Sequence, residues 1–201
     1  MKRRTFCTGV ASGIALTAGC AGVLGDEIGT VRFYVSDQPN RIEDFEYLHV
    51  TISAVAFKPA DEDDGGDEAS DDEPQPRGGW EEYDLDDQTL DLTELQGDRA
   101  TMLDELEVPA GEYNAVDLFV DDIEAVLTED LGGGEAEVTI PSETLRLRTP
   151  FTVEADEELD FVYDIAPHEA GRSDQYVLTP VISESGTDVA IEEVDARVGD
   201  E

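Results

Sequence analysis

The sequence of 201 residues predicts an all-β protein, with a single antiparallel β-sandwich over residues 29–183. Apolar and polar residues alternate with a period of two in several segments, as in strands that are buried on one face. Turn-forming residues separate these segments about every 8 to 12 residues, and no segment has the apolar spacing of a long helix. The length is sufficient for one domain with a hydrophobic core and short for two.

Residues 1–19 are predicted to be an export signal. Lys2, Arg3 and Arg4 precede an uncharged run over residues 6–18, the order of charge and apolar character found in secretory signals. The run is too short for a membrane-spanning helix, which needs about 20 apolar residues. The adjacent pair Arg3 and Arg4 resembles a twin-arginine export signal.

The stretch "TAGC", which ends at Cys20, resembles a lipobox, in which the cysteine becomes the first residue of the mature chain and carries lipid. One lipid chain holds a protein to a membrane only marginally, so stable attachment implies double acylation. The alternative is an ordinary cleaved signal with an incidental cysteine. We expect an extracytoplasmic protein anchored to the membrane through Cys20, with residues 20–28 as a spacer.

The charge of the chain is strongly acidic. Without residues 1–19 it keeps nine basic residues against 51 acidic ones, a net charge of −42, and Lys58 is its only lysine. Such a charge strains a compact protein at low salt, whereas at molar salt the Debye length falls to about 3 Å and the repulsion is screened. The composition resembles that of proteins from salt-loving archaea. It argues against binding to DNA or RNA, because phosphate contacts require clustered Lys and Arg.

The first two strands are predicted on either side of the turn "SDQPN". In residues 29–36, Val31, Phe33 and Val35 point to one side. Residues 45–57 form a long central strand whose apolar pattern changes phase near Ala54 to Phe57, which indicates a β-bulge.

Residues 59–79 are predicted to be a disordered acidic insertion in a hairpin. Nine acids lie between Asp61 and Glu73, and no apolar residue larger than alanine accompanies them. Structure resumes at Trp80, which is expected in the core or at its rim.

The central part of the chain is predicted to continue in strands. Residues 100–113 begin with a helical turn, which Pro109 and Gly111 bring to an end. Residues 112–127 form a strand with Val116 and Leu118 pointing inward. The glycine tract that follows is not a phosphate loop, because it lacks the Gly-Lys-Ser/Thr sequence and a following helix.

The last strands are predicted in residues 144–153, 158–166 and 175–183. Pro180 places the third of them at an edge or an end. Residues 184–201 are predicted to be an acidic tail with a weak last strand. One face of the strand over 158–166 holds Leu159, Phe161, Tyr163 and Ile165.

The order of "VRFYVSDQP", "VTISAVAF", "LDLTELQG", "VPAGEYNAVDLFV", "VTIPS" and "YVLTPVIS" resembles the family called domain of unknown function 4382 (DUF4382), which occurs in exported bacterial and archaeal proteins. The resemblance covers residues 29–183 and suggests a haloarchaeal type of exported lipoprotein. It implies a transthyretin-like or carboxypeptidase-regulatory-like β-sandwich. It implies no activity and no catalytic residue.

The absence of a catalytic motif favours a non-catalytic binding or structural module at the cell surface, with a surface protein or a glycan as its partner. The alternative is a calcium-dependent binding protein that uses Asp37, Asp121 and Asp122, because carboxylates are the hard oxygen ligands that Ca²⁺ takes. No other cofactor is expected. A secreted hydrolase built on scattered carboxylates is the third hypothesis.

Overall fold

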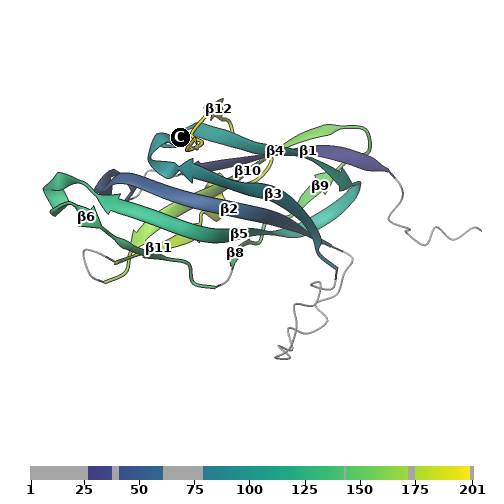
Figure 1. Ribbon diagram of the computed structural model, residues 1–201. Coiled ribbons are helices and arrows are strands. Elements are labelled where there is room, and N and C mark those ends of the chain that lie inside the picture. The colour runs from purple at the N-terminus through teal and green to yellow at the C-terminus, as the bar shows by residue number, and fades with distance from the viewer. Residues whose placement is uncertain (1–26, 38–40, 61–78, 143, 172–174, 200–201) are drawn as a thin grey trace, which may run out of the picture.

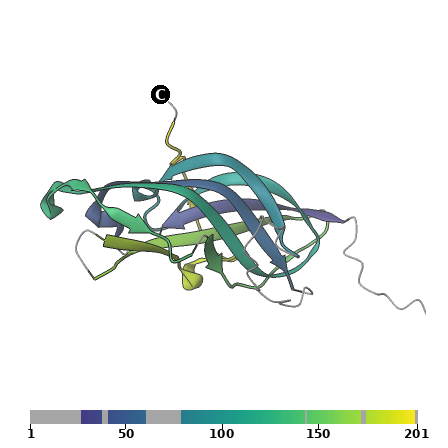
Figure 2. The same cartoon turned by 60° about the horizontal axis from the view of Figure 1, so that its bottom comes forward.

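The alternating apolar segments form two β-sheets that pack face to face in a computed structural model of the chain (Figures 1 and 2). The structure describes residues 27–37, 41–60, 79–142, 144–171 and 175–199, and α-helix is absent from these ranges. The predicted all-β sandwich is therefore confirmed.

The first sheet has the strand order β12-β4-β1-β10-β11-β7. Its strands are β1 (Ile28–Asp37), β4 (Arg99–Pro109), β7 (Glu137–Thr139), β10 (Glu158–Glu169), β11 (Gln175–Pro180) and β12 (Glu192–Glu193). The first strand in the chain thus lies in the middle of this sheet.

The second sheet has the order β3-β2-β5-β6, and β8 and β9 also pair with β5. Its strands are β2 (Phe45–Pro59), β3 (Glu81–Asp91), β5 (Gly111–Leu127), β6 (Gly134–Glu135), β8 (Thr144–Leu147) and β9 (Phe151–Val153). The predicted long central strand is β2, which lies between β3 and β5.

The second sheet is antiparallel throughout, whereas the first combines antiparallel with parallel pairs. The parallel pairs are β1 with β10, β11 with β7 and β12 with β4. The pairing of β1 with β10 is the longest of the three, and it runs through the centre of the sheet. A parallel pair needs a long connection, and the connection from β1 to β10 contains the whole second sheet together with β4 and β7.

Short 3₁₀ turns connect some of these strands. They are η1 (Ile42–Asp44), η2 (Leu92–Glu94), η3 (Glu129–Leu131) and η4 (Ile182–Glu184). Among the described residues we find no helix with the length and apolar character needed to cross a membrane.

One local expectation was wrong. Residues 100–113 do not begin with a helical turn, because β4 runs through Met102 as a strand. The side chains of Ala100, Leu103 and Leu106 are buried in the folded protein, and β4 pairs along its length with β1. Burial against the neighbouring strand overrides the local helical propensity here.

The expected bulge in β2 is present. The pairing register between β2 and β3 shifts between Ile52 and Ala54, and that between β2 and β5 shifts in the same place. The shift lets Val50, Ile52, Val55 and Phe57 all be buried, although their spacing is not strictly two.

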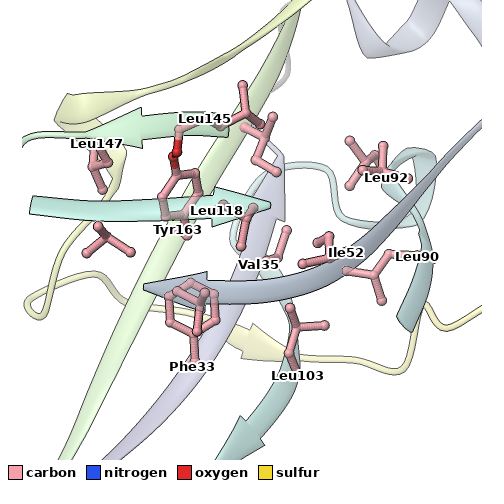
Figure 3. Packing of buried hydrophobic residues seen from close by; sticks show 14 of the residues in the cluster. Phe33, Val35, Ile52, Leu90, Leu92, Leu103, Leu118, Leu145, Leu147 and Tyr163 are labelled. Atoms are coloured by element: carbon pink, nitrogen blue, oxygen red, sulfur yellow. The ribbon is translucent and has the colours of Figure 1, made fainter. Parts of the chain in front are cut away.

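The core lies between the two sheets and contains the apolar faces that the sequence predicts (Figure 3). Phe33 of β1 stacks on Phe161 of β10 with ring centroids 5.9 Å apart, and Phe57 of β2 meets Phe33 edge to face. The buried Tyr163 hydroxyl donates to the Leu145 carbonyl at 2.6 Å and so satisfies its polar atom across the two sheets. Burial of each such large side chain contributes about 1.5–3 kcal/mol.

The segment after β11 closes one open side of the sandwich. It pairs with β4 through β12 and with β3 through two backbone bonds, from the Asp91 N–H to the Ala196 carbonyl and from the Val198 N–H to the Thr89 carbonyl. Ala196 is buried and belongs to the core. The predicted acidic tail therefore connects the two sheets.

The same segment covers part of the outer face of the first sheet. Tyr34, Ala100 and Val162 form a second small apolar cluster there, against which Val189 and Ile191 pack. Tyr34 alternates with the core residues of β1 and yet is buried, because this segment lies over it.

Candidate functional site

Basic side chains gather at one place on this acidic protein. Seven of the described residues are Lys or Arg, namely Arg32, Arg41, Lys58, Arg99, Arg146, Arg148 and Arg197. Three of them line one pocket of about 230 Å³. We call this the basic pocket; it is lined by Lys58, Trp80, Asn114, Ala115, Arg146 and Arg148.

Strand register brings the lining residues together on the outer face of the second sheet. Lys58, near the end of β2, lies opposite Ala115 of β5. On the other side of β5, Arg146 of β8 lies opposite Asp117. Leu145 and Leu147 of β8 are buried in the core, so the alternation of the strand turns Arg146 outward.

A buried carboxylate fixes the position of Arg146. Asp117 is fully buried and accepts two hydrogen bonds from Arg146, from Nε to Oδ1 at 2.7 Å and from Nη2 to Oδ2 at 2.8 Å. Bidentate pairs of this kind are short and directional. The region of the pocket thus holds three cations, Lys58, Arg146 and Arg148, and one carboxylate, that of Asp117. The formal charge of these four groups is +2.

Trp80, just before β3, adds an aromatic wall and is half-buried at the rim, as the sequence predicts. The guanidinium carbon of Arg146 lies 4.9 Å from the centroid of the Trp80 ring, within the range of a cation–π contact. Arg146 is therefore held both by Asp117 and by the indole. A guanidinium fixed in this way loses little conformational entropy when it binds a ligand.

β1 begins and β2 ends at the same end of the sandwich (Figure 1), and Lys58 of the basic pocket is the residue before the last in β2. The start of β1 and the end of β4 are paired, with Ile28 opposite Pro109. Pro59 of β2 lies opposite Tyr113 of β5 near the same end. The first strand thus begins on the side of the pocket.

The three predicted calcium ligands lie in different sheets. Asp37 ends β1 in the first sheet, whereas Asp121 and Asp122 belong to β5 in the second. Asp121 is exposed and accepts a hydrogen bond from the Ser53 hydroxyl at 2.8 Å, and Asp122 is exposed opposite Thr51. Over the described ranges no group of three or more His, Cys, Asp or Glu is arranged to hold a metal ion. Calcium binding stays a prediction.

Asp37 is an unusual buried acid. It shares the inward phase of Phe33 and Val35 on β1, and neither of its carboxyl oxygens has a hydrogen-bond partner among the described residues. Burial raises the pKa of Asp37 from 3.8 to about 9, and the negative charge of Asp164 adds to this shift. The Asp37 carboxyl therefore holds its proton at neutral pH, and a cation that binds there has to displace that proton.

The residues of the export signal, Arg3 and Arg4, and the predicted lipid attachment site Cys20 lie outside the described residues. The predicted acidic insertion also lies outside them between residues 61 and 78. The strands on either side of it, β2 and β3, pair in antiparallel fashion.

The cations of the basic pocket are not among the predicted site residues, although two signals in the sequence point to them. In "LRLR", Arg146 and Arg148 alternate with two leucines, which places both guanidinium groups on one side of a half-buried strand. Lys58 and Trp80 are each the only residue of their type after the export signal. The register that places β2 and β8 on either side of β5 has no such local signal.

A family model described as "Domain of unknown function (DUF4382)" matches residues 28–180. The matched span runs from β1 to the end of β11 and includes every residue of the basic pocket. No curated protein and no solved structure was found to match the chain.

Proposed function

Since the chain belongs to the DUF4382 family, a domain of unknown function, we propose its role from its own geometry: it is a non-catalytic binding module that takes an anionic group of its partner into the basic pocket. The module is held at the cell surface by lipid on Cys20 and works in a salt-rich medium.

The observation that carries the proposal is the convergence of Lys58, Arg146 and Arg148 on one pocket. Like charges that face one cavity repel each other. An anion bound between them is attracted to each cation, and this attraction offsets their repulsion.

The acidic composition supports function in concentrated salt. At molar ionic strength the Debye length is about 3 Å, so attraction between distant charges is screened. An anion is then held through direct contacts and hydrogen bonds, which a pocket supplies and a flat surface does not. Arg146, fixed by Asp117, is one such preorganised donor.

The anion site is tested by thermal unfolding of the full chain in molar KCl, with sodium sulfate, phosphate or acetate added at constant ionic strength. A ligand that binds only the folded state raises the melting temperature in a saturable way. We expect such a rise in the wild type and a loss of most of it in Arg148→Gln. The matched control is Arg99→Gln, an exposed cation at the start of β4 outside the pocket. An equal rise in wild type and Arg148→Gln contradicts the proposal.

The anchoring is tested by cell fractionation. We expect the wild type in the membrane fraction and Cys20→Ser in the soluble fraction. Wild-type protein in the soluble fraction contradicts attachment through Cys20. It does not bear on the anion site, which the thermal unfolding experiment tests separately.

A further inference from the structure

The size of the basic pocket limits what can enter it. Sites that enclose a drug-sized ligand have volumes of about 300–1,000 Å³, and the basic pocket has about 230 Å³. It therefore suits one end group of a larger molecule, with the remainder of that molecule outside.

The lining combines three kinds of chemistry. Lys58, Arg146 and Arg148 supply positive charge, Asn114 supplies an amide that both donates and accepts, and Trp80 supplies an apolar aromatic surface. An inorganic anion uses the cations and the N–H groups of the amide, and it leaves the indole unused. The amide fits hydroxyl groups, and the indole fits the C–H face of a saturated ring.

An anionic lipid surface fits the site less well. Exposed acids lie at the same end of the sandwich, among them Glu112 at the start of β5 and Glu154 and Glu157 beside Gly29. A flat anionic surface that approaches this end meets these carboxylates together with the pocket. A single end group enters the pocket and avoids them.

We propose that the basic pocket binds an acidic sugar ring, a uronic acid at the end of a glycan. Arg148 and Lys58 contact the carboxylate of the sugar, Asn114 contacts ring hydroxyls, and Trp80 packs against the ring. This inference rests on the proposed function, because it names the ligand class of the same site.

The test is calorimetric titration of the full chain in molar KCl with methyl β-glucuronide, and in parallel with methyl β-glucoside and with acetate. We expect the glucuronide to bind more tightly than either comparison ligand, because only the glucuronide presents both the acid and the ring. Trp80→Ala lowers the glucuronide affinity by roughly five- to tenfold, the loss expected for one aromatic contact. Asn114→Ala is a second variant that also weakens the glucuronide, and Arg99→Gln is the control outside the pocket.

Three other outcomes overturn the proposal in different ways. If acetate binds as tightly as the glucuronide, the acidic sugar is wrong and the anion site stands. If vesicles of anionic lipid bind and the glucuronide does not, the ligand is a membrane surface and the sugar proposal is wrong. If no anion binds, the proposed function fails together with this inference.

Discussion

Asp117 is fully buried, and Arg146, whose side chain is 33% exposed, holds both of its carboxyl oxygens. The pair joins β5 to β8 on the outer face of the second sheet. Because Asp117 is fully buried, the loss of Arg146 removes the charge that balances this carboxylate in a place from which water is excluded.

Arg146→Leu is expected to lower the free energy of unfolding by about 3 kcal/mol, because it removes the bidentate cationic partner of the buried Asp117 carboxylate. The double variant Asp117→Leu with Arg146→Leu is expected to lose less than the sum of the two single variants, because no unpaired charge remains. Urea unfolding in molar KCl measures all four proteins of this cycle. Losses that simply add contradict a coupled pair.

The pKa of Asp37 predicts a pH dependence of stability. The folded chain keeps the Asp37 proton up to about pH 9, whereas an unfolded aspartate releases it near pH 3.8. The contribution of Asp37 to the free energy of unfolding is therefore complete below pH 3.8 and is lost as the pH rises toward 9. Between these values the free energy of unfolding falls by about 1.4 kcal/mol per pH unit on account of this group.

Asp37→Asn is expected to remove this slope and to raise stability at pH 8 relative to the wild type. Urea unfolding from about pH 6 to 8.5 measures it, since ordinary carboxylates stay ionised in that range. The exposed Asp122→Asn is the control and keeps the slope of the wild type. A wild-type slope equal to that of Asp37→Asn shows that Asp37 is ionised in the folded protein.

Gly29 of β1 has no room for a side chain. A Cβ at this position overlaps the Glu154 carbonyl and lies 2.7 Å from Cγ1 of Val153. Gly29→Ala is expected to lower stability by about 3 kcal/mol, because backbone and a buried side chain have to move. Gly199→Ala meets no atom within 4 Å and is expected to change nothing. Equal melting temperatures for the two variants contradict this close approach.

The segment after β11 is predicted to be part of the stable fold. Ala196→Asp places a charge in the core beside β3 and is expected to cost about 3 kcal/mol. Ala170→Asp, at an exposed alanine after β10, is the control. Hydrogen exchange of the Asp91 and Val198 amides measures directly whether this segment stays bonded to β3, because both amides donate hydrogen bonds between the segment and β3. Rapid exchange of these amides in the wild type contradicts such bonding.

The inward faces of the strands were predictable from the sequence. The period of two predicts that Val31, Phe33 and Val35 share a buried face, and the structure buries all three. The parallel pairing that places β1 beside β10 was not predictable. It joins residues 128 positions apart, such as Thr30 and Glu158, and no local pattern marks such a pair.

The basic pocket was only partly predictable. The "LRLR" alternation places two arginines on one side of a strand, but the position of Lys58 and Trp80 beside them depends on how β2, β5 and β8 are ordered. The burial of Asp117 depends on the same order. Alternation alone predicts that an outward-facing charged residue such as Asp117 is exposed, and its burial becomes predictable only once the neighbouring strand that supplies Arg146 is known.

The central position of β1 has a consequence for synthesis. A ribosome adds about 5–20 residues per second, so roughly ten seconds pass between the emergence of Asp37 and that of β10. During this interval Phe33 lacks its stacking partner, Phe161, and the strand can pair only with β4. The nascent chain therefore completes its sandwich late, once the segment that bonds to Thr89 and Asp91 has also left the ribosome. Until then the apolar face of β1 is a surface on which a chaperone can act.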